Sequence, residues 1–261
     1  MKIIVTIKQV PDTHEVRLDP VKGTLIREGV PSIINPEDKN AIEEALKLKE
    51  SRGAEVIVIS MGPPQADEAL REALAMGVDQ AILISDPAFA GADTWATATT
   101  LGLAVRKIGD YDLVLAGRQA IDGDTAQVGP QLAEYLGIPQ ITYVRKLEIE
   151  DNKVKAERAL EDGYEVIETD LPALLTITKE ANKPRYPSAP GIISAYRERE
   201  VIVWGADDLD ADRDKVGLKG SPTQVKRSFT PPPKEPGEVI QGSPQELAKE
   251  FVARLKSKNI I

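Results

Sequence analysis

Four short apolar segments, each separated from the next by a stretch with helical periodicity, constrain the fold of this chain most strongly. The apolar segments are residues 2–8, 55–60, 80–85 and 111–116, and helical spacing is found at 36–49, 64–76, 93–108 and 125–136. Strands with so little polar alternation are covered on both faces, which is typical of a parallel sheet. The sequence therefore predicts a doubly wound, mostly parallel α/β domain of the Rossmann-like kind.

The second half of the chain has a different pattern. Residues 141–147, 153–159, 165–169 and 173–178 read as strands joined by short turns, and we expect them to extend the same sheet. A proline-rich extended arm follows at 219–237, and a helix with a narrow apolar stripe is expected at 243–256. We predict an α/β nucleotide-binding domain at 1–206 and a C-terminal arm and helix at 207–261. The pattern alone leaves open whether the arm packs on a partner subunit or on its own domain.

Composition excludes several classes of function. The net charge of −9 disfavours a nucleic-acid binder, and the chain has no cysteine and a single histidine, so no thiolate or His-rich metal site is expected. His14 lies in a polar loop and is interpreted as a solvated residue, not as a base. The chain has no apolar run long enough to span a membrane, and its N-terminus reads as a buried strand, so we expect a cytoplasmic protein. Chemistry would have to come mostly from a bound cofactor.

The strongest candidate site is the strand–loop–helix junction at 117–129 (GRQAIDGDTAQVG). Ligands of doubly wound sheets bind at the carboxyl ends of the strands, where this loop lies. Asp124 is expected to cap the following helix, with Gln127 at the reciprocal position. Free N–H groups and the helix dipole favour a phosphate there, Gly123 permits close approach of the backbone, and Thr125 offers a hydroxyl.

The negative charges of Asp122 and Asp124 would repel a phosphate, so a cap or a ribose contact suits them better. An ordinary helix cap in a loop would also explain the residues of this junction. The junction matches neither a Walker A loop nor a GxGxxG fingerprint.

Three other loops also lead into expected helices, and each is a candidate for contact with a ligand. Asn35 stands at a capping position before Pro36, which opens a helix. Gly62 permits a tight turn beside a ligand, and the small residues of 91–97 open a helix that could accept a flat ring. Plain caps and strand-to-helix turns would explain the same residues.

Taken together and in order, these segments resemble the β subunit of electron-transfer flavoproteins over essentially the whole chain. The most specific stretch is 156–176 (AERALEDGYEVIETDLPALLT), which fits the signature pattern of that family and is interpreted as structural. The resemblance implies a C-terminal arm that embraces the α subunit, and in conventional members a structural AMP. By resemblance, the nucleotide pocket takes in Thr6, Asn35, Pro36, Asp38, Met61, Gly117, Arg118, Gln119, Asp122, Gly123, Asp124, Thr125, Ala126, Gln127 and Val128.

The stretches 61–64 (MGPP), 89–97 (FAGADTWAT) and 117–130 look like the electron-bifurcating branch of that family, in which a second FAD replaces AMP. Asp93, Thr94 and Thr97 would then line the flavin, and Arg118 is a candidate cationic contact to flavin or phosphate. The implied reaction is hydride transfer from NADH. One electron then passes to ferredoxin or flavodoxin. The other passes to the α-subunit FAD and onward to a dehydrogenase or quinone oxidoreductase.

One departure from the conventional pattern concerns partner docking by Tyr186, Ala189 and Pro190. Conventional members carry a bulky aliphatic anchor where this chain has Ala189. Its loss would forfeit about 2–3 kcal/mol of apolar burial, so a standard acyl-CoA dehydrogenase partner is disfavoured. A membrane-associated quinone oxidoreductase or another dehydrogenase is favoured instead.

Two alternatives remain beside the bifurcating subunit. One is a conventional β subunit that holds AMP and shuttles electrons without NADH chemistry. The other is a stand-alone adenine-nucleotide sensor on the same scaffold.

Overall fold

The computed structural model describes residues 1–12, 31–227, 229, 237 and 239–261 of the chain. His14 lies outside the described residues. The chain forms two compact units, Met1–Val225 and Lys226–Ile261. The expected division after residue 206 falls inside the first unit. The segment that follows it, 207–225, therefore belongs with the α/β domain, and the second unit begins only at Lys226.

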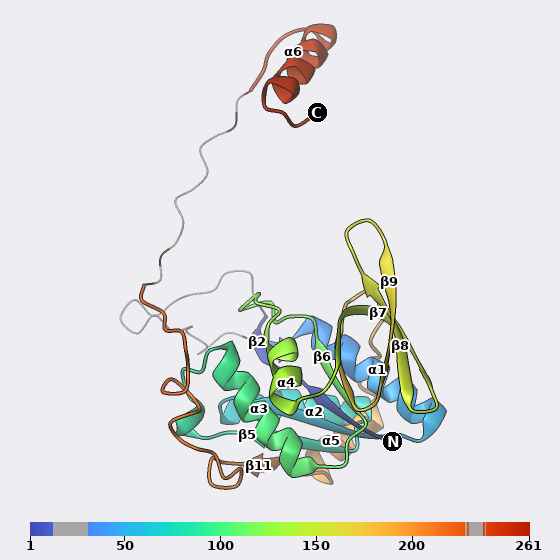
Figure 1. Ribbon diagram of the computed structural model, residues 1–261, viewed down its shortest axis with the longest axis vertical. Helices are drawn as coiled ribbons and strands as arrows, with labels where there is room; N and C mark the ends of the chain where they lie inside the picture. The colour runs from blue at the N-terminus through green and yellow to red at the C-terminus, as the bar shows by residue number, and fades with distance from the viewer. Residues whose placement is uncertain (13–30, 228, 230–236, 238) are drawn as a thin grey trace. The chain divides into compact units, whose positions relative to one another are not determined.

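A nine-stranded sheet with the order β11-β5-β4-β1-β6-β10-β7-β8-β9 forms the centre of the first unit (Figure 1). Its neighbouring strands are parallel from β11 to β7, and only the β7–β8 and β8–β9 pairs are antiparallel. The predicted α/β fold is confirmed, and the later strands do extend the same sheet. The strands are β1 (Lys2–Thr6), β4 (Glu55–Met61), β5 (Gln80–Ile84), β6 (Leu113–Gly117), β7 (Gln140–Glu150), β8 (Lys153–Ala159), β9 (Tyr164–Asp170), β10 (Ala173–Ile177) and β11 (Ile202–Trp204).

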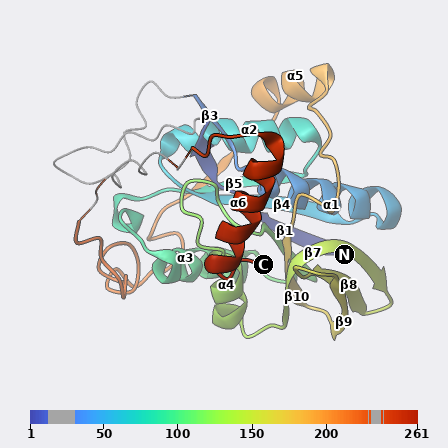
Figure 2. The same ribbon diagram turned by 90° about the horizontal axis from the view of Figure 1, so that it is seen from above.

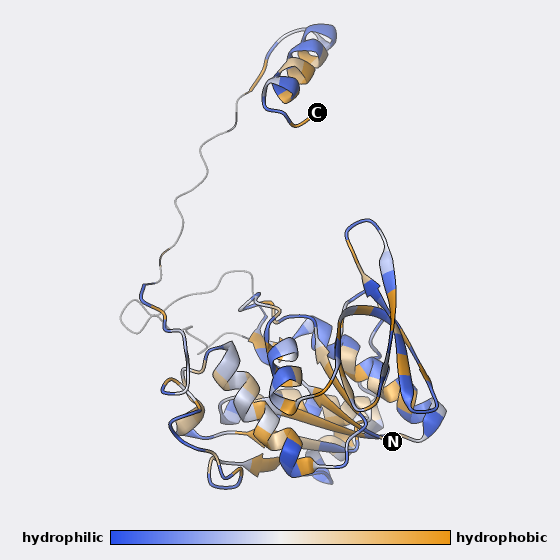
Figure 3. Ribbon diagram, viewed as in Figure 1, coloured by the Kyte–Doolittle hydropathy of each residue, from blue (hydrophilic) through white to orange (hydrophobic). Residues whose placement is uncertain are grey.

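Helices cover both faces of this sheet. In Figure 2, α1 (Pro36–Arg52), α2 (Asp67–Met76) and α5 (Ala189–Arg197) lie on one side of the strands, with α3 (Thr94–Ile108) and α4 (Val128–Leu136) on the other. Each face has its own apolar core, and in β1 Ile3 and Val5 belong to one core while Ile4 belongs to the other. The central strands are accordingly almost uniformly hydrophobic in Figure 3, as expected for strands buried on both faces.

The order of the strands places a topological switch point between β1 and β6. From β1 the chain adds β4 and then β5 on one side, and it returns to add β6 on the other side of β1. The loops that leave β1 and β6 therefore diverge at the carboxyl edge of the sheet, where doubly wound proteins open a ligand crevice.

Several elements differ from the sequence prediction. Helix α4 begins at Val128, three residues later than expected, because Asp124 and Ala126 have left-handed backbone conformations that a right-handed helix cannot include. The sequence did not predict α5, since its surroundings are rich in proline. In fact Ser188 caps that helix by accepting a hydrogen bond from the Gly191 N–H at 3.1 Å, and Pro190 is tolerated in its first turn.

Further short elements were also not predicted. They are β11, the antiparallel pair β2 (Gln9–Pro11) and β3 (Ser32–Ile34), and the 3₁₀ turn η2 (Pro87–Phe89), whereas the 3₁₀ turn η1 (Pro64–Ala66) is the first turn of the helix expected at 64–76. At three residues each, they are too short to carry a hydrophobic period.

The second unit contains helix α6 (Pro244–Ser257), close to the expected 243–256. Ser243 and Glu246 form a capping box at its start. The helix has no buried residue, and Phe251 and Val252 are exposed. Within the described part of the chain, no helix is long and apolar enough to cross a membrane.

Candidate functional site

The loop that leaves β6 at the carboxyl edge of the sheet is fixed by the start of α1. The Asn35 side chain donates from Nδ2 to the Gln119 carbonyl at 2.9 Å and accepts at Oδ1 from the Ile121 N–H at 3.1 Å. Asn35 occupies the N-cap position of α1, but its side chain makes no capping bond because both of its polar atoms are used in this bridge. The sequence-predicted segments around residues 35–38 and 117–127 are thus in contact.

Asp38 connects the two strands at the switch point. Its carboxylate accepts from the Lys8 main-chain N–H at 2.7 Å, from Asn35 Nδ2 at 3.0 Å and from the main-chain N–H of Gly117. Burial raises the pKa of Asp38 to about 7 against the opposing effect of these hydrogen bonds. The residue holds the end of β1 and the end of β6 to the same helix start.

Gly117 is required by the close approach of α1. A Cβ at this position would lie 2.2 Å from Asp38 Oδ1 and 2.8 Å from the main chain of Glu37 and Asp38. The glycine is therefore needed for the packing of α1 against β6. Glu37 and Asp38 of α1 occupy the space that a side chain at this position would need.

Arg118 is paired with a carboxylate. Its Nε donates to Glu37 Oε2 at 3.2 Å, and the same oxygen accepts from the Gln119 N–H at 3.2 Å. Burial raises the pKa of Glu37, and the nearby Arg118 partly offsets this effect. The guanidinium also lies 5.8 Å from the Tyr143 ring centroid. This arrangement places a cation, held by Glu37, at the carboxyl edge of the sheet.

The aspartates of the loop have partners within the protein. Lys8 Nζ contacts both carboxylate oxygens of Asp122, at 2.6 and 2.8 Å. Asp124 accepts from the Gln119 side-chain amide and does not cap α4, which corrects the capping-box prediction. The reason is local: Asp124 lies in the turn closed by the Ala120 carbonyl, with a φ of 51°, and α4 starts only after Gln127.

The end of this loop presents main-chain donors. Among the described residues, the N–H groups of Thr125, Ala126 and Gln127 have no partner, and no side chain caps α4. Ala126 has a φ of 53°. Left-handed residues next to right-handed ones turn successive N–H groups to one side, which is a known way to bind an anion. Together with the dipole of α4, these donors fit a phosphate.

The surroundings of these donors also fit a nucleotide. A Cβ added at Gly123 would meet nothing within 4 Å, so the loop is open on that side. Lys8 and Arg118 are already paired with Asp122 and Glu37, so the binding of a phosphate here would depend on main-chain N–H groups.

The start of α3 lies beside the start of α4. Thr94 Oγ1 donates to Gln127 Oε1 at 3.2 Å, which joins the two expected ligand segments directly. Asp93 caps α3 by accepting from the Ala96 N–H at 3.0 Å, and its other oxygen accepts from the N–H and hydroxyl of Thr223. Burial opposes ionisation of Asp93, but these hydrogen bonds outweigh it and lower its pKa. Thr97 lies one turn into the same helix.

The carboxyl ends of β1 and β4 lie at the same edge of the sheet as the loop that leaves β6. Thr6 is paired in register with Ile59 on one side and Ala116 on the other, and it is 8% exposed. Met61 ends β4, and the Gly62 N–H that follows it donates to the Ile84 carbonyl at 3.1 Å. The expected site residues of β1, α1, β4, α3 and β6 are therefore gathered on adjacent strands and helix starts.

The expected docking residues lie elsewhere. Tyr186 is 89% exposed, and Ala189 and Pro190 begin α5, whose Gly191 packs against the Ala75 carbonyl near the end of α2. Arg185 fixes this segment to α1 through Glu43 and Glu50. The expected docking residues and the residues at the carboxyl edge of the sheet are thus in different parts of the first unit.

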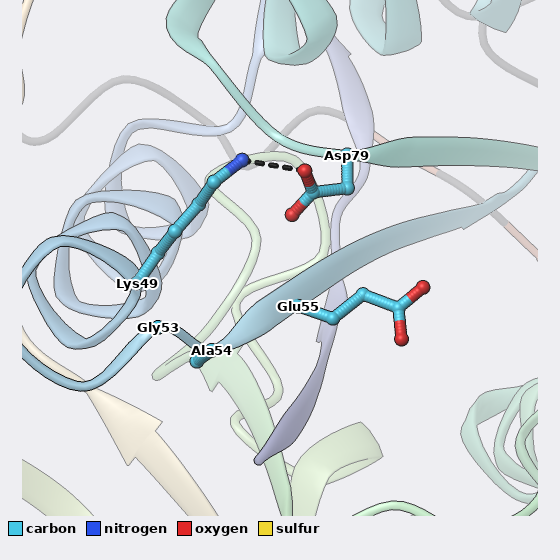
Figure 4. A pocket seen from close by; sticks show the side chains of 5 residues that line it. All are labelled: Lys49, Gly53, Ala54, Glu55 and Asp79. Atoms are coloured by element: carbon cyan, nitrogen blue, oxygen red, sulfur yellow. Dashed lines mark hydrogen bonds and ion pairs between the residues drawn. The ribbon is translucent and has the colours of Figure 1, made fainter.

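A cavity of about 430 Å³ is formed by Lys49, Gly53, Ala54, Glu55 and Asp79. Lys49 Nζ forms an ion pair with Asp79 Oδ1 (Figure 4), and the two atoms are 2.6 Å apart. Because Glu55 opens β4 and Asp79 precedes β5, this cavity lies at the amino ends of the strands. It is therefore at the wrong edge of the sheet for a ligand of a doubly wound fold.

Comparison with known proteins agrees with this architecture. Residues 22–209 match the family described as the electron transfer flavoprotein domain. The chain is 61% identical to the electron transfer flavoprotein subunit beta of Thermoanaerobacterium thermosaccharolyticum, over the whole of both chains. It is 57% identical to the caffeyl-CoA reductase-Etf complex subunit CarD of Acetobacterium woodii and 46% identical to the acryloyl-CoA reductase electron transfer subunit gamma of Anaerotignum propionicum, again over the whole of both chains. The chain belongs to the electron transfer flavoprotein family, among its β subunits.

Proposed function

We propose that this chain binds FAD at the carboxyl edge of its sheet and works as one subunit of an NADH-oxidising, electron-bifurcating flavoprotein. The observation that carries the proposal is the set of unpartnered main-chain donors at Thr125, Ala126 and Gln127, beside the start of α3. Main-chain donors at a helix start suit the diphosphate of a dinucleotide. The Thr94–Gln127 contact brings a second helix start to the same place.

The residues of this chain would bind and orient the cofactor. The N–H groups of 125–127 would hold the phosphates, while Asn35 and Asp38 keep the loops of β1 and β6 at fixed positions. Thr94 and Thr97, in the first turn of α3, would face the flavin portion. Lys8 would neutralise Asp122, which keeps a carboxylate from repelling the phosphates.

When bound, FAD would supply the redox chemistry of the proposed function, which is the oxidation of NADH and one-electron delivery to ferredoxin or flavodoxin and to the FAD of an α subunit. The protein contributes position and electrostatics, and no side chain is assigned as an acid or base. The relatives named as subunits of a caffeyl-CoA reductase complex and an acryloyl-CoA reductase support a role in a reductase assembly.

We propose that the C-terminal unit packs on the α subunit. Within its own unit, helix α6 has no buried residue among those the structure describes, and it exposes Phe251 and Val252. Tyr186, Ala189 and Pro190 would face a dehydrogenase or quinone oxidoreductase, because Tyr186 is exposed and the segment is anchored by Arg185. Because the Ala189 side chain is small, it favours a partner whose surface has no deep pocket for a bulky aliphatic side chain.

The test is to purify the chain with its α subunit, count FAD and AMP per heterodimer, and titrate with NADH in the absence of oxygen. The proposal expects two FADs per heterodimer and bleaching of the flavin absorption on addition of NADH. One FAD with one AMP and no bleaching would instead identify a conventional β subunit. A stable chain that binds AMP alone, without an α subunit, would identify an adenine-nucleotide sensor.

A further inference from the structure

Tyr143 has an unusual backbone conformation. It lies within β7 and has a φ of 58°, the left-handed region that bulky residues rarely adopt. The β7–β10 register shifts at this point: Ile141 pairs with Leu175, but Val144 pairs with Ile177. The Tyr143 N–H donates to Thr176 Oγ1 at 3.0 Å, and Thr178 donates its main-chain N–H to the Val144 carbonyl at 3.0 Å. The irregularity is thus fixed by hydrogen bonds to β10.

The irregularity has a clear packing role. Ile141 and Val144 are three residues apart, yet both are buried in the same core. A regular strand would turn one of them to the opposite face, so an extra residue is needed between them. A glycine would serve this purpose without strain, since it adopts positive φ freely. The tyrosine ring is therefore not explained by the packing of β7.

The ring lies at the rim of the candidate site. Ile177 pairs with both Val144 and Gly117, so Tyr143 is at the level at which β6 ends. Its ring centroid is 5.8 Å from the guanidinium carbon of Arg118. Arg118 is in turn held by Glu37, at 3.2 Å, and its main-chain N–H donates to the Ile177 carbonyl at 2.9 Å. Tyr143 as a whole residue is 37% exposed, so it is accessible to a ligand.

We propose that Tyr143 contacts the flat ring system of the bound nucleotide, with Arg118 holding the tyrosine ring in place from its other side. This inference rests on the proposed nucleotide site and adds a residue that neither the motifs nor the comparisons assign. A planar heteroaromatic ring is the fitting ligand group because an aromatic side chain next to a guanidinium offers a flat, polarised surface. A role of the ring in binding would then explain why a tyrosine occupies a position where its backbone is strained.

The test compares three variants of the chain, each purified with its α subunit and stripped of nucleotide. Tyr143→Gly relieves the strained φ and removes the ring, Tyr143→Phe retains the ring, and Tyr164→Ala is the matched control. Tyr164 is also exposed and lies 4.4 Å from an arginine, Arg145, but it is on β9, away from the site. The dissociation constants for FAD and AMP and the melting temperature without ligand are measured for each.

The proposal expects Tyr143→Gly to weaken binding about tenfold while its ligand-free melting temperature stays equal to that of the wild type or rises. Tyr143→Phe and Tyr164→Ala should bind like the wild type. Weaker binding of both nucleotides would assign the contact to adenine, and weaker binding of FAD alone would assign it to the flavin. Wild-type affinity in Tyr143→Gly would overturn this inference alone. A wild-type complex that binds neither nucleotide would overturn the proposed site as well.

Discussion

At the scale of single residues, Asp38 illustrates a difference between the role that the sequence suggests and the contacts that the structure shows. The resemblance includes Asp38 among the pocket residues, but sequence cannot tell a ligand contact from a structural one. In the structure its carboxylate accepts from Lys8, Asn35 and Gly117, three groups of the protein itself. Its role is therefore to position the loops, a role that depends on the fold and has no sequence motif.

The buried carboxyl of Asp38 leads to a prediction about pH. Its pKa is raised by burial from 3.8 to about 7, so between these values the folded protein binds more protons than the unfolded chain does. The stabilisation from this group is then fully present below pH 3.8 and is lost as the pH rises to about 7, with no further change above. Urea unfolding across this range should show the wild type losing stability relative to Asp38→Asn as the pH rises. A stability difference that is independent of pH would contradict the assignment.

At the scale of elements, the succession of strands and helices in the first half of the chain could be predicted, because the central strands are buried and the segments between them have apolar residues at helical spacing. The start of α4 could not, because DGDTAQ looks like a helix cap, whereas in the structure Asp124 and Ala126 have left-handed backbone conformations. Helix α5 was hidden by the prolines around it. The contact of Thr94 with Gln127 joins residues 33 positions apart, and only the packing of α3 against α4 produces it.

The packing of α1 on β6 leads to a prediction for two glycines. Gly117→Ala would place a Cβ 2.2 Å from Asp38 Oδ1, so α1 or the strand end must move. We expect a loss of about 1–3 kcal/mol in the free energy of unfolding, measured by urea denaturation, together with weaker nucleotide binding. Gly123→Ala is the matched control, because its Cβ meets nothing within 4 Å in the protein. Equal stability of the two variants would show that α1 does not approach β6 this closely.

At the scale of the whole molecule, the α/β fold and the extension of the sheet by β7, β8 and β9 follow from the sequence pattern. The pattern did not reveal that residues up to Val225 belong to the first unit. Those residues are held by contacts far apart in sequence, such as the Thr223 hydrogen bonds to Asp93 and the Leu218 N–H bond to the Ala90 carbonyl, at 3.0 Å. Irregular segments of this kind carry no period, so only the folded structure assigns them to a unit.

The central claim is that main-chain donors at the carboxyl edge of the sheet bind the diphosphate of FAD. The most direct measurement is a crystal structure of the chain with its α subunit and the nucleotide that co-purifies with it. The account predicts two linked phosphates within hydrogen-bond distance of the N–H groups of Thr125, Ala126 and Gln127, and a flavin ring at the crevice. A single phosphate of AMP at these donors, or a nucleotide bound at another edge of the sheet, would contradict it.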